Sequence, residues 1–373
     1  MNKKLQVTNE RSSIPPAVRR KIRESLLQWF AEHGRDLPWR RNYSPYEVWI
    51  SEIMLQQTQI KTMLPFYFRW MERFPDAASI AGTSEDELFR YWEGLGYYAR
   101  AKNLQKAARR IVSEFSGKIP EDFDSVRALP GVGPYTAGAI MSFAFNADVP
   151  AADANAARIF SRLFDISVPS DSGEFRNVVW YYAFDVLPRG RSRDFNQALM
   201  DFGSRICLPR SPLCVECPLA SCCEARKKGV ADLRPVHGGR KAVVQVVRAV
   251  GIAIEDGKVL VRKRPESGLM PNLWEFPGGE AQNGEGPEQT LRRAWLRELG
   301  MEIGRLEKVA VIKHTHTTFR VTLHAFLCRV PACNFPDDAP AARWIDLREL
   351  ERLAFPAAHR KIIRALSKRL PEL

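Results

Sequence analysis

The chain has 373 residues, a length that predicts two or three domains rather than one. Lysine and arginine number 56 against 43 aspartates and glutamates, and the net charge of +13 favours a polyanionic partner. No apolar run is long enough to cross a membrane, and the polar start MNKKLQVTNERSS lacks the apolar stretch of a signal peptide. We therefore exclude a membrane protein and expect a cytoplasmic one.

The first half of the chain is predicted to be a succession of helices with short breaks. Basic and apolar residues alternate at helical spacing over residues 17–32. A second helix is predicted to start at Pro45, because Ser44 and Glu47 fit a capping box around it. Glu52 lies two turns into that helix among apolar residues. The pattern favours the solvated face for it, whereas burial would raise its pKa and make it a general acid.

Glycines interrupt the helical pattern in YWEGLGYYARAKNLQKAARRIVSEF, residues 91–115. Gly94 and Gly96 are predicted to end one helix, and Tyr97 and Tyr98 then precede a helix with a basic face. Aromatic and basic side chains together can stack on bases and hold phosphates. Tyrosines packed in a core beside a solvated basic helix are an equally good interpretation.

The segment from Leu129 to Phe160 organises the helical half. Its turn contains Gly131, Val132 and Gly133, and backbone N–H groups of such a turn can bind a DNA phosphate, although a plain structural turn is commoner. The small, apolar residues after the turn predict a buried helix. Asp153 follows in an alanine-rich stretch, where it is predicted to be the N-cap of the next helix. A carboxylate kept ionised at a helix start can also stabilise a sugar cation.

Five of the seven cysteines fall within residues 207–223. The spacing C-x6-C-x2-C-x5-C predicts a metal site more than a disulfide framework, with a [4Fe–4S] cluster or a structural zinc as the candidates. The predicted ligands are Cys207, Cys214, Cys217 and Cys223. Cys222 is an alternative fourth ligand, but the spacing favours Cys223.

The composition changes after the last of these cysteines. Residues 229–242 are charged and glycine-bearing, without an apolar period, and are predicted to be a linker. Alternating apolar residues then indicate strands, two of them joined by a hairpin turn at Asp256-Gly257, with a helix at Glu288 to Leu299. We therefore predict an all-α domain over residues 1–228, which includes the cysteine segment, and an α+β domain over residues 243–373.

Five features in this order resemble the helix-hairpin-helix DNA glycosylases, and within them the MutY-type adenine glycosylases: WISEIMLQQTQI, GLGYYARAKNL, LPGVGPYTAGAI, DANAARI and the four cysteines. The resemblance spans essentially the whole chain, because the second half is similar to the Nudix-like domain of those enzymes. It implies a monomer of the bacterial cytosol or nucleoid that carries a [4Fe–4S] cluster. It also implies base excision repair, by hydrolysis of the N-glycosidic bond of adenine opposite 8-oxoguanine or guanine in duplex DNA.

The resemblance implies catalytic roles for four residues. Glu52 matches the acid that protonates the flipped adenine and then helps to activate water. Asp153 matches the carboxylate that stabilises, or transiently bonds, the cationic sugar. Tyr135 and Asn155 match residues that hold these groups in place. Bifunctional members carry a lysine at the position of Tyr135, so a phenol there predicts a monofunctional glycosylase without Schiff-base chemistry.

The resemblance also implies contacts with the duplex. Gln57 and Tyr97 match residues that wedge into the base stack, which the target base must leave before it reacts. The family's lesion-reading Phe-Ser-His is replaced by His316, Thr317 and Thr318. Thr317 keeps the hydroxyl, while Thr318 lacks the imidazole.

A Nudix box can be laid on the second half, with Gly279, Glu285, Arg293, Glu298 and Gly300 in register. Two of its acidic positions hold Ala294 and Arg297, so we expect a domain that binds DNA and does not hydrolyse nucleotides. Three other functions stay open from the sequence: a bifunctional glycosylase and lyase like endonuclease III, a DNA-binding iron–sulfur redox sensor, and a nucleotide pyrophosphohydrolase.

Overall fold

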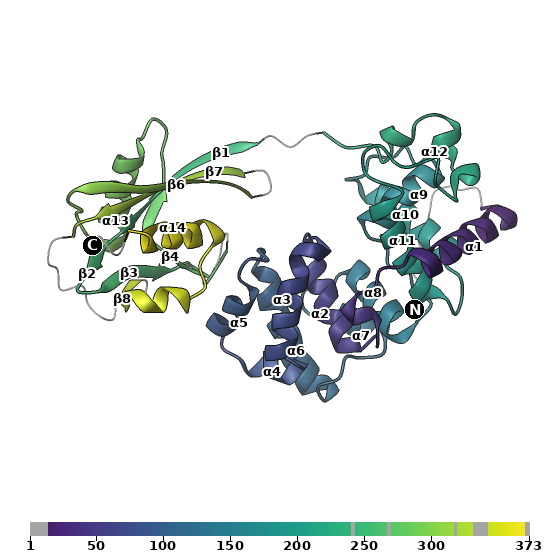
Figure 1. The fold of residues 1–373 in the computed structure, drawn as a ribbon, viewed down its shortest axis with the longest axis horizontal. Coiled ribbons are helices and arrows are strands. Elements are labelled where there is room, and N and C mark those ends of the chain that lie inside the picture. Colours follow the sequence, from purple (N-terminus) through teal and green to yellow (C-terminus); the bar gives the residue numbers. More distant parts are fainter. Residues whose placement is uncertain (1–13, 240–242, 267–269, 317–318, 331–341, 370–373) are drawn as a thin grey trace. The chain divides into compact units, whose positions relative to one another are not determined.

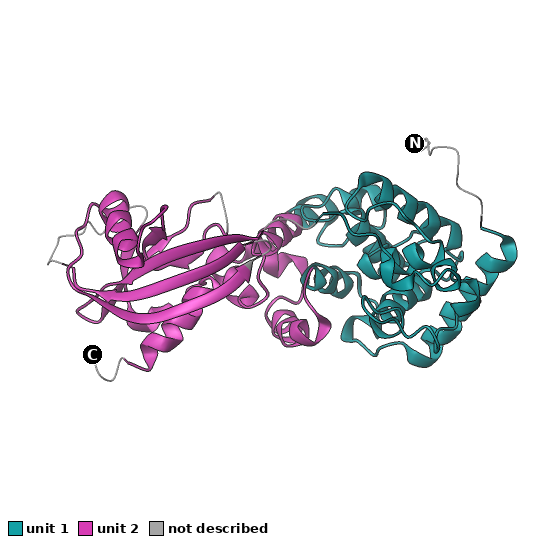
Figure 2. Ribbon diagram, turned by 90° about the horizontal axis from the view of Figure 1, so that it is seen from above, with its two compact units in different colours: residues 1–56, 110–239 teal, residues 57–109, 240–373 magenta. Residues whose placement is uncertain are grey.

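The computed structural model describes residues 14–239, 243–266, 270–316, 319–330 and 342–369. The chain divides into two compact units, one made of residues 1–56 and 110–239 and the other of residues 57–109 and 240–373 (Figure 2). The predicted fold class is confirmed, since helices fill the first half and an α+β arrangement fills the second (Figure 1). Residues 57–109 group with the C-terminal half in this division. The predicted domain boundaries at 228 and 242 stay a prediction.

All the regular secondary structure in the described residues of the first unit is helical. Its core lies between α1, α9, α10 and α11, where large side chains such as Trp29, Phe160 and Phe202 are buried. No helix in the described part of the chain is long and apolar enough to cross a membrane. The elements of this unit are α1 (Pro16–His33), η1 (Pro38–Arg40), α2 (Pro45–Leu55), α7 (Phe123–Arg127), α8 (Pro134–Phe145), α9 (Ala154–Leu163), α10 (Gly173–Val186), α11 (Ser192–Arg205), η2 (Ala220–Cys222), α12 (Glu224–Lys227) and η3 (Ala231–Leu233).

Helices α7 and α8, with the glycine turn between them, form a helix–hairpin–helix. Gly131 has φ 79°, a left-handed conformation that glycine adopts without strain. Gly133 is the N-cap of α8 and Pro134 is its first residue, where a missing N–H costs nothing. The helix is buried over Thr136 to Phe143, as its small, apolar sequence predicts.

Helix α2 begins at Pro45, as predicted, but the predicted capping box is wrong. Ser44 is the N-cap residue and its side chain makes no capping hydrogen bond. Asn42 acts in its place, because its Oδ1 accepts from the backbone N of Ser44 at 3.1 Å and its Nδ2 donates to Glu47 Oε1 at 3.1 Å. An amide can donate and accept at once, so it connects the turn to the first helical turn.

The second unit contains helices of the N-terminal half: α3 (Ile60–Arg73), α4 (Ala77–Gly82), α5 (Glu85–Trp92) and α6 (Ala99–Phe115), the last of which continues into the first unit. The predicted break after α5 is confirmed. Gly94 and Gly96 have φ of 103° and 70°, and Tyr97 follows in the left-handed region at 49°. Tyr98 is buried, as the core interpretation predicts, and Tyr97 is half-buried, while contact of either tyrosine with bases stays a prediction.

Two four-stranded sheets, one mixed and one antiparallel, form the α+β part of the second unit. One has the order β5-β1-β7-β6, with β1 and β7 parallel, and in the other β3 pairs with β2, β4 and β8. The predicted hairpin is confirmed at Asp256 and Gly257, which both have positive φ. The elements are β1 (Val244–Ile252), β2 (Ile254–Glu255), β3 (Lys258–Lys263), β4 (Trp274–Glu275), β5 (Gly278–Glu280), α13 (Pro287–Leu299), β6 (Leu306–His316), β7 (Phe319–Cys328), β8 (Ala342–Asp346), η4 (Leu347–Glu351) and α14 (Ala357–Ser367).

Candidate functional site

Glu52 is buried in the first unit, so the solvated face that the sequence pattern favours is wrong. Only 3% of its surface is exposed, and its neighbours along α2 are buried too. Tyr135, near the start of α8, donates its hydroxyl to Glu52 Oε2 at 2.7 Å. Burial raises the pKa of Glu52 to about 7, and the hydrogen bond from Tyr135 opposes that rise. Glu52 is therefore a carboxyl that can carry a proton near neutral pH.

Asp153 is the N-cap of α9, as predicted. Its Oδ1 accepts from the backbone N of Ala156 at 2.7 Å, and its Oδ2 accepts from Asn155 Nδ2 at 2.7 Å. Burial nevertheless raises the pKa of Asp153, and these hydrogen bonds act against the rise. The charge of Asp153 also raises the pKa of Glu52, and both carboxyls raise the pKa of Tyr135, so the two acids are close enough to interact. The site thus holds two acids with different partners.

Two glycines allow the chain to bring these residues together. A Cβ at Gly138 of α8 would collide with the carbonyl oxygen of Pro150, so glycine lets the segment before Asp153 lie directly on α8. A Cβ at Gly203 of α11 would lie 2.5 Å from Cβ of Asn155. Any side chain at Gly138 or Gly203 would therefore collide with the segment packed against it.

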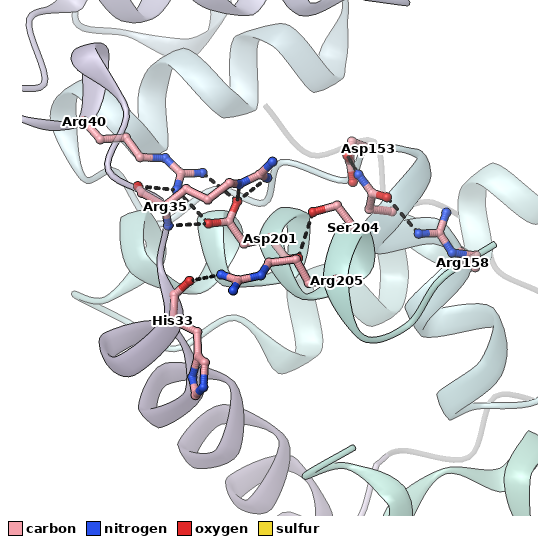
Figure 3. A network of polar contacts seen from close by, with 9 residues as sticks. His33, Arg35, Arg40, Asp153, Arg158, Asp201, Ser204 and Arg205 are labelled. Atoms are coloured by element: carbon pink, nitrogen blue, oxygen red, sulfur yellow. Dashed lines mark hydrogen bonds and ion pairs between the residues drawn. The ribbon is translucent and has the colours of Figure 1, made fainter. Parts of the chain in front are cut away.

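A network around Asp201 borders the site (Figure 3). The Asp201 carboxylate is fully buried on α11 and accepts two hydrogen bonds from Arg40, at 2.8 and 3.0 Å, and others from Arg35. The two arginines hold the pKa of Asp201 below its ordinary value in spite of burial. The positive charge of Arg40 acts in turn on Glu52 and lowers its pKa.

Arg158 connects the site to the cysteine segment. Its Nη2 donates to Asn155 Oδ1 at 2.8 Å and to the Gly203 carbonyl at 2.7 Å, and its Nε donates to the Cys207 carbonyl at 2.9 Å. Asn155 donates to Asp153, so one chain of hydrogen bonds runs from Cys207 to Asp153. The orientation of Asp153 thereby depends on the fold of residues after α11.

The four predicted metal ligands lie near one another. Burial raises the pKa of the Cys217 thiol to about 12, and the thiols of Cys207, Cys223 and Cys214 each contribute to that rise. Arg162 Nη1 lies 3.2 Å from Cys207 Sγ. A buried guanidinium beside a thiol suits a site whose sulfurs are ionised. Among the described residues no group of three or more histidine, cysteine or acidic side chains is placed to hold a metal ion.

The other predicted site residues lie in the hairpin turn, in the second unit or outside the described residues. Gly131 and Gly133 are exposed in the hairpin turn, and Val132 between them is buried. Gln57 and Tyr97 belong to the second unit, and both have positive φ, at 59° and 49°. Thr317, Thr318 and the side chain of His316 lie outside the described residues.

Two family models match the chain. The HhH-GPD superfamily of base excision DNA repair proteins matches residues 50–180, which include Glu52, Tyr135, Asp153 and Asn155. The NUDIX domain matches residues 249–365. The two matches cover the helical and the α+β parts in turn.

Relatives match along almost the whole chain. The human adenine DNA glycosylase is 32% identical over 94% of this chain and 74% of its own length. The chain belongs to the adenine DNA glycosylases. A bacterial member from Buchnera aphidicola subsp. Acyrthosiphon pisum is 31% identical over 92% of this chain and 97% of its own. A solved structure of a thermostable thymine-DNA glycosylase is 30% identical and has a TM-score of 0.52, over 57% of this chain and 98% of that one.

Sequence reasoning missed the residues that support the two acids in this family member. Arg40 and Asp201 are 161 positions apart and carry no shared pattern. Arg158 lies inside the DANAARI motif, three residues after Asn155, and that helical spacing is the one available signal.

The pKa of Glu52 makes its burial measurable as stability. The pKa of Glu52 in the folded protein, about 7, exceeds its ordinary 4.5. The stabilisation of the fold by the protonated carboxyl is therefore complete below pH 4.5 and is lost as the pH rises through 7. Glutamine cannot ionise. We expect the free energy of unfolding of Glu52→Gln, relative to that of the wild type, to be about 3 kcal/mol higher at alkaline pH than at acidic pH. Urea unfolding at pH 4.5 and pH 9 measures this, with the exposed Glu121→Gln as control. A difference that does not vary with pH contradicts it.

Proposed function

We propose that this adenine DNA glycosylase is monofunctional and releases adenine opposite 8-oxoguanine or guanine in duplex DNA, within base excision repair. The observation that carries the proposal is the pairing of two buried carboxyls with different environments in one site. Glu52 has a pKa of about 7 and one phenol partner, while Asp153 accepts two hydrogen bonds at a helix start. Carboxyls that differ in this way divide the acid and the charge-stabilising roles at a glycosidic bond.

Glu52 is the proposed general acid. Adenine leaves poorly as an anion, so a proton on the base lowers the barrier to its departure. A pKa of about 7 keeps a large fraction of Glu52 protonated at neutral pH. After the base has left, the resulting carboxylate can accept a proton from the attacking water.

Asp153 is the proposed stabiliser of the sugar cation. Its carboxylate is fixed from both sides, by the N–H of Ala156 and the amide of Asn155, so it cannot turn away from the site. A fixed negative charge needs no reorganisation when positive charge develops. Asn155 and Tyr135 are positioning residues in this scheme.

Contacts with the duplex are proposed for two groups of residues. Gln57 and Tyr97 would enter the base stack, since the target adenine must leave the helix before it meets Glu52. The turn at Gly131, Val132 and Gly133 would face a DNA phosphate, because its exposed glycines leave room for close approach.

A [4Fe–4S] cluster is the proposed cofactor, and its ligands would be Cys207, Cys214, Cys217 and Cys223. The mutual influence of the four thiols and the buried Arg162 beside Cys207 fit an anionic cluster. The chemistry that it would supply is structural, because four bonds to sulfur fix a segment with little regular structure. Arg162 also donates hydrogen bonds to the carbonyls of Leu208 and Pro209 in this segment and to that of Ala231 after it.

The Nudix-like part is proposed to read the lesion without hydrolysis, through residues 316–318. Among the described residues, the carboxylates of the Nudix box are paired with arginines. Glu285 is paired with Arg293 at 2.7 Å, and Arg262 contacts Glu298, Glu275 and the Gly278 carbonyl. A guanidinium among these carboxylates stands where a hydrolase needs a divalent cation. Action as a cytoplasmic monomer stays a prediction of the sequence.

Glu52→Gln should bind mispaired DNA and lose adenine excision. Removal of a general acid costs about 10²–10⁴-fold in rate. Asp153→Asn should lose a comparable factor, because it removes the charge placed beside the cation. Single-turnover release of adenine from duplexes with each mispair measures both, and Glu47→Gln on the same helix is the control. Excision by Glu52→Gln at the wild-type rate refutes the assignment.

The wild-type enzyme should leave an abasic site and an uncut strand. The phenol of Tyr135 lies 2.7 Å from Glu52, and it has no amine for a Schiff base. Product strands should therefore break only after alkali, and borohydride should trap no enzyme–DNA adduct. A duplex with a preformed abasic site is the control substrate. An efficient adduct would show a bifunctional enzyme.

The purified protein should contain iron and acid-labile sulfide. Cys214→Ala should lose the iron, while Cys222→Ala, a matched change beside Cys223, should keep it, since the Cys222 thiol is bonded to the Leu219 carbonyl. Metal analysis and visible absorption of both variants decide this. Zinc in place of iron in anaerobically purified protein would rule the cluster out.

A further inference from the structure

Within the second unit, Arg360 of α14 is joined to Glu93, which follows α5. Arg360 binds both carboxylate oxygens of Glu93, with Nη2 to Oε2 at 2.6 Å. The pair is largely buried, with side-chain exposures of 14% and 19%. Arg360 also donates to the carbonyls of Leu350 at 2.8 Å and Leu353 at 2.6 Å. The guanidinium is thus fixed by its own part of the fold, and its remaining hydrogen bonds reach a residue 267 positions away.

A second contact lies five residues further along the chain. The hydroxyl of Tyr98 donates to the Phe355 carbonyl at 3.5 Å, and Tyr98 is 4% exposed. Burial raises the pKa of Tyr98 well above its usual range, and Glu93 and Arg360 are the charges that act on it. The two contacts are therefore neighbours, and Tyr97 stands between Glu93 and Tyr98 in the chain.

The loop between these contacts is held from inside as well. Trp92 Nε1 donates to the Gly96 carbonyl at 2.9 Å, and Arg100 Nη2 donates to the carbonyls of Leu95 and Gly96 at 3.0 and 3.2 Å. The Arg100 guanidinium lies 5.7 Å from the ring centroid of Tyr97. These hydrogen bonds connect the backbone between Glu93 and Tyr97 to the side chains of Trp92 and Arg100 on either side of it.

The start of α5 adds charge-complementary contacts to the same face. Glu85 Oε1 accepts from Asn272 Nδ2 at 2.7 Å, and Asp86 pairs with Lys263 at 3.2 Å. Asn272 is buried and belongs to the segment between β3 and β4. Acidic groups of the N-terminal helices thus meet polar and basic groups of the Nudix-like fold at several points, and the most buried of these is the Glu93–Arg360 pair.

We propose that Glu93 and Arg360 are positioning residues that lock the Tyr97 loop to the Nudix-like fold, so that reading of an oxidised guanine and displacement of the adenine opposite occur as one event. The inference rests on the proposed function, in which Tyr97 enters the stack and the Nudix-like part reads the lesion. An ion pair with both partners fixed transmits a displacement, because neither side chain can turn to absorb it. Binding energy at the lesion then favours the base-displaced state.

The test changes the Glu93 side of the pair, because Arg360 keeps its bonds to the Leu350 and Leu353 carbonyls and holds α14 in place. Glu93→Gln removes the charge and keeps the shape, and Glu93→Lys places two cations together. The same changes at Glu114, exposed and paired with Arg110 on α6, are the matched controls. Full-length variants are compared by single-turnover adenine release opposite 8-oxoguanine and opposite guanine.

We expect release opposite 8-oxoguanine to slow by about tenfold in Glu93→Gln, and more in Glu93→Lys, while release opposite guanine stays within about twofold. The Glu114 variants should match the wild type on both duplexes. Equal losses on the two duplexes would show a structural role only and overturn the proposal, and so would no loss on either.

Base displacement can be followed without catalysis, by the fluorescence of 2-aminopurine in place of the target adenine. In an uncut duplex, Glu93→Lys should reduce its unstacking opposite 8-oxoguanine and not opposite guanine. Failure of the wild type to release adenine from any mispair would refute the proposed function. Unchanged unstacking in Glu93→Lys would refute the coupling, so the two failures are distinguishable.

Discussion

Burial of two carboxyls in one site is the constraint on which the helical unit depends. A carboxylate removed from water loses several kcal/mol of solvation unless partners replace the lost hydrogen bonds. The unit supplies those partners unequally. Glu52 receives one hydrogen bond from a phenol and the positive charge of Arg40, which do not offset its burial, so its pKa rises to about 7 and its neutral form is favoured. Asp153 receives a backbone N–H and an amide that is itself held by Arg158.

Arginine has a second use in this chain besides attraction to DNA. Arg23 donates to three carbonyls between residues 185 and 187, and Arg193 donates to two at the end of α8. Arg162 does the same for the segment after Cys207. A planar group with five donors in a fixed fork can satisfy several orphaned carbonyls at once, whereas lysine has three donors on a single nitrogen. Some of the arginines that contribute to the net charge of +13 therefore stabilise the fold.

Local chemistry explains which features the sequence could predict. Pro45 and Pro134 mark helix starts because proline suits the first helical position, and Asp256-Gly257 marks a hairpin because both residues adopt positive φ. The burial of Glu52 runs against the rule that a carboxylate is seldom buried, and the apolar neighbours on all sides of α2, typical of a buried helix, are the signal that indicates it. Contacts between distant positions, such as Arg40 with Asp201 and Glu93 with Arg360, leave no local signature at all.

The guanidinium of Arg262 has a consequence for how this fold can change over time. It contacts Glu275, Glu298 and the Gly278 carbonyl, while Ala294 on α13 is buried against Gly279. A glutamate at residue 294 would add one carboxylate, yet Arg262 would still lie between Glu275 and Glu298 and β5 would still pack closely against α13. A divalent-cation site at this place would therefore need coordinated substitutions on β3, β5 and α13.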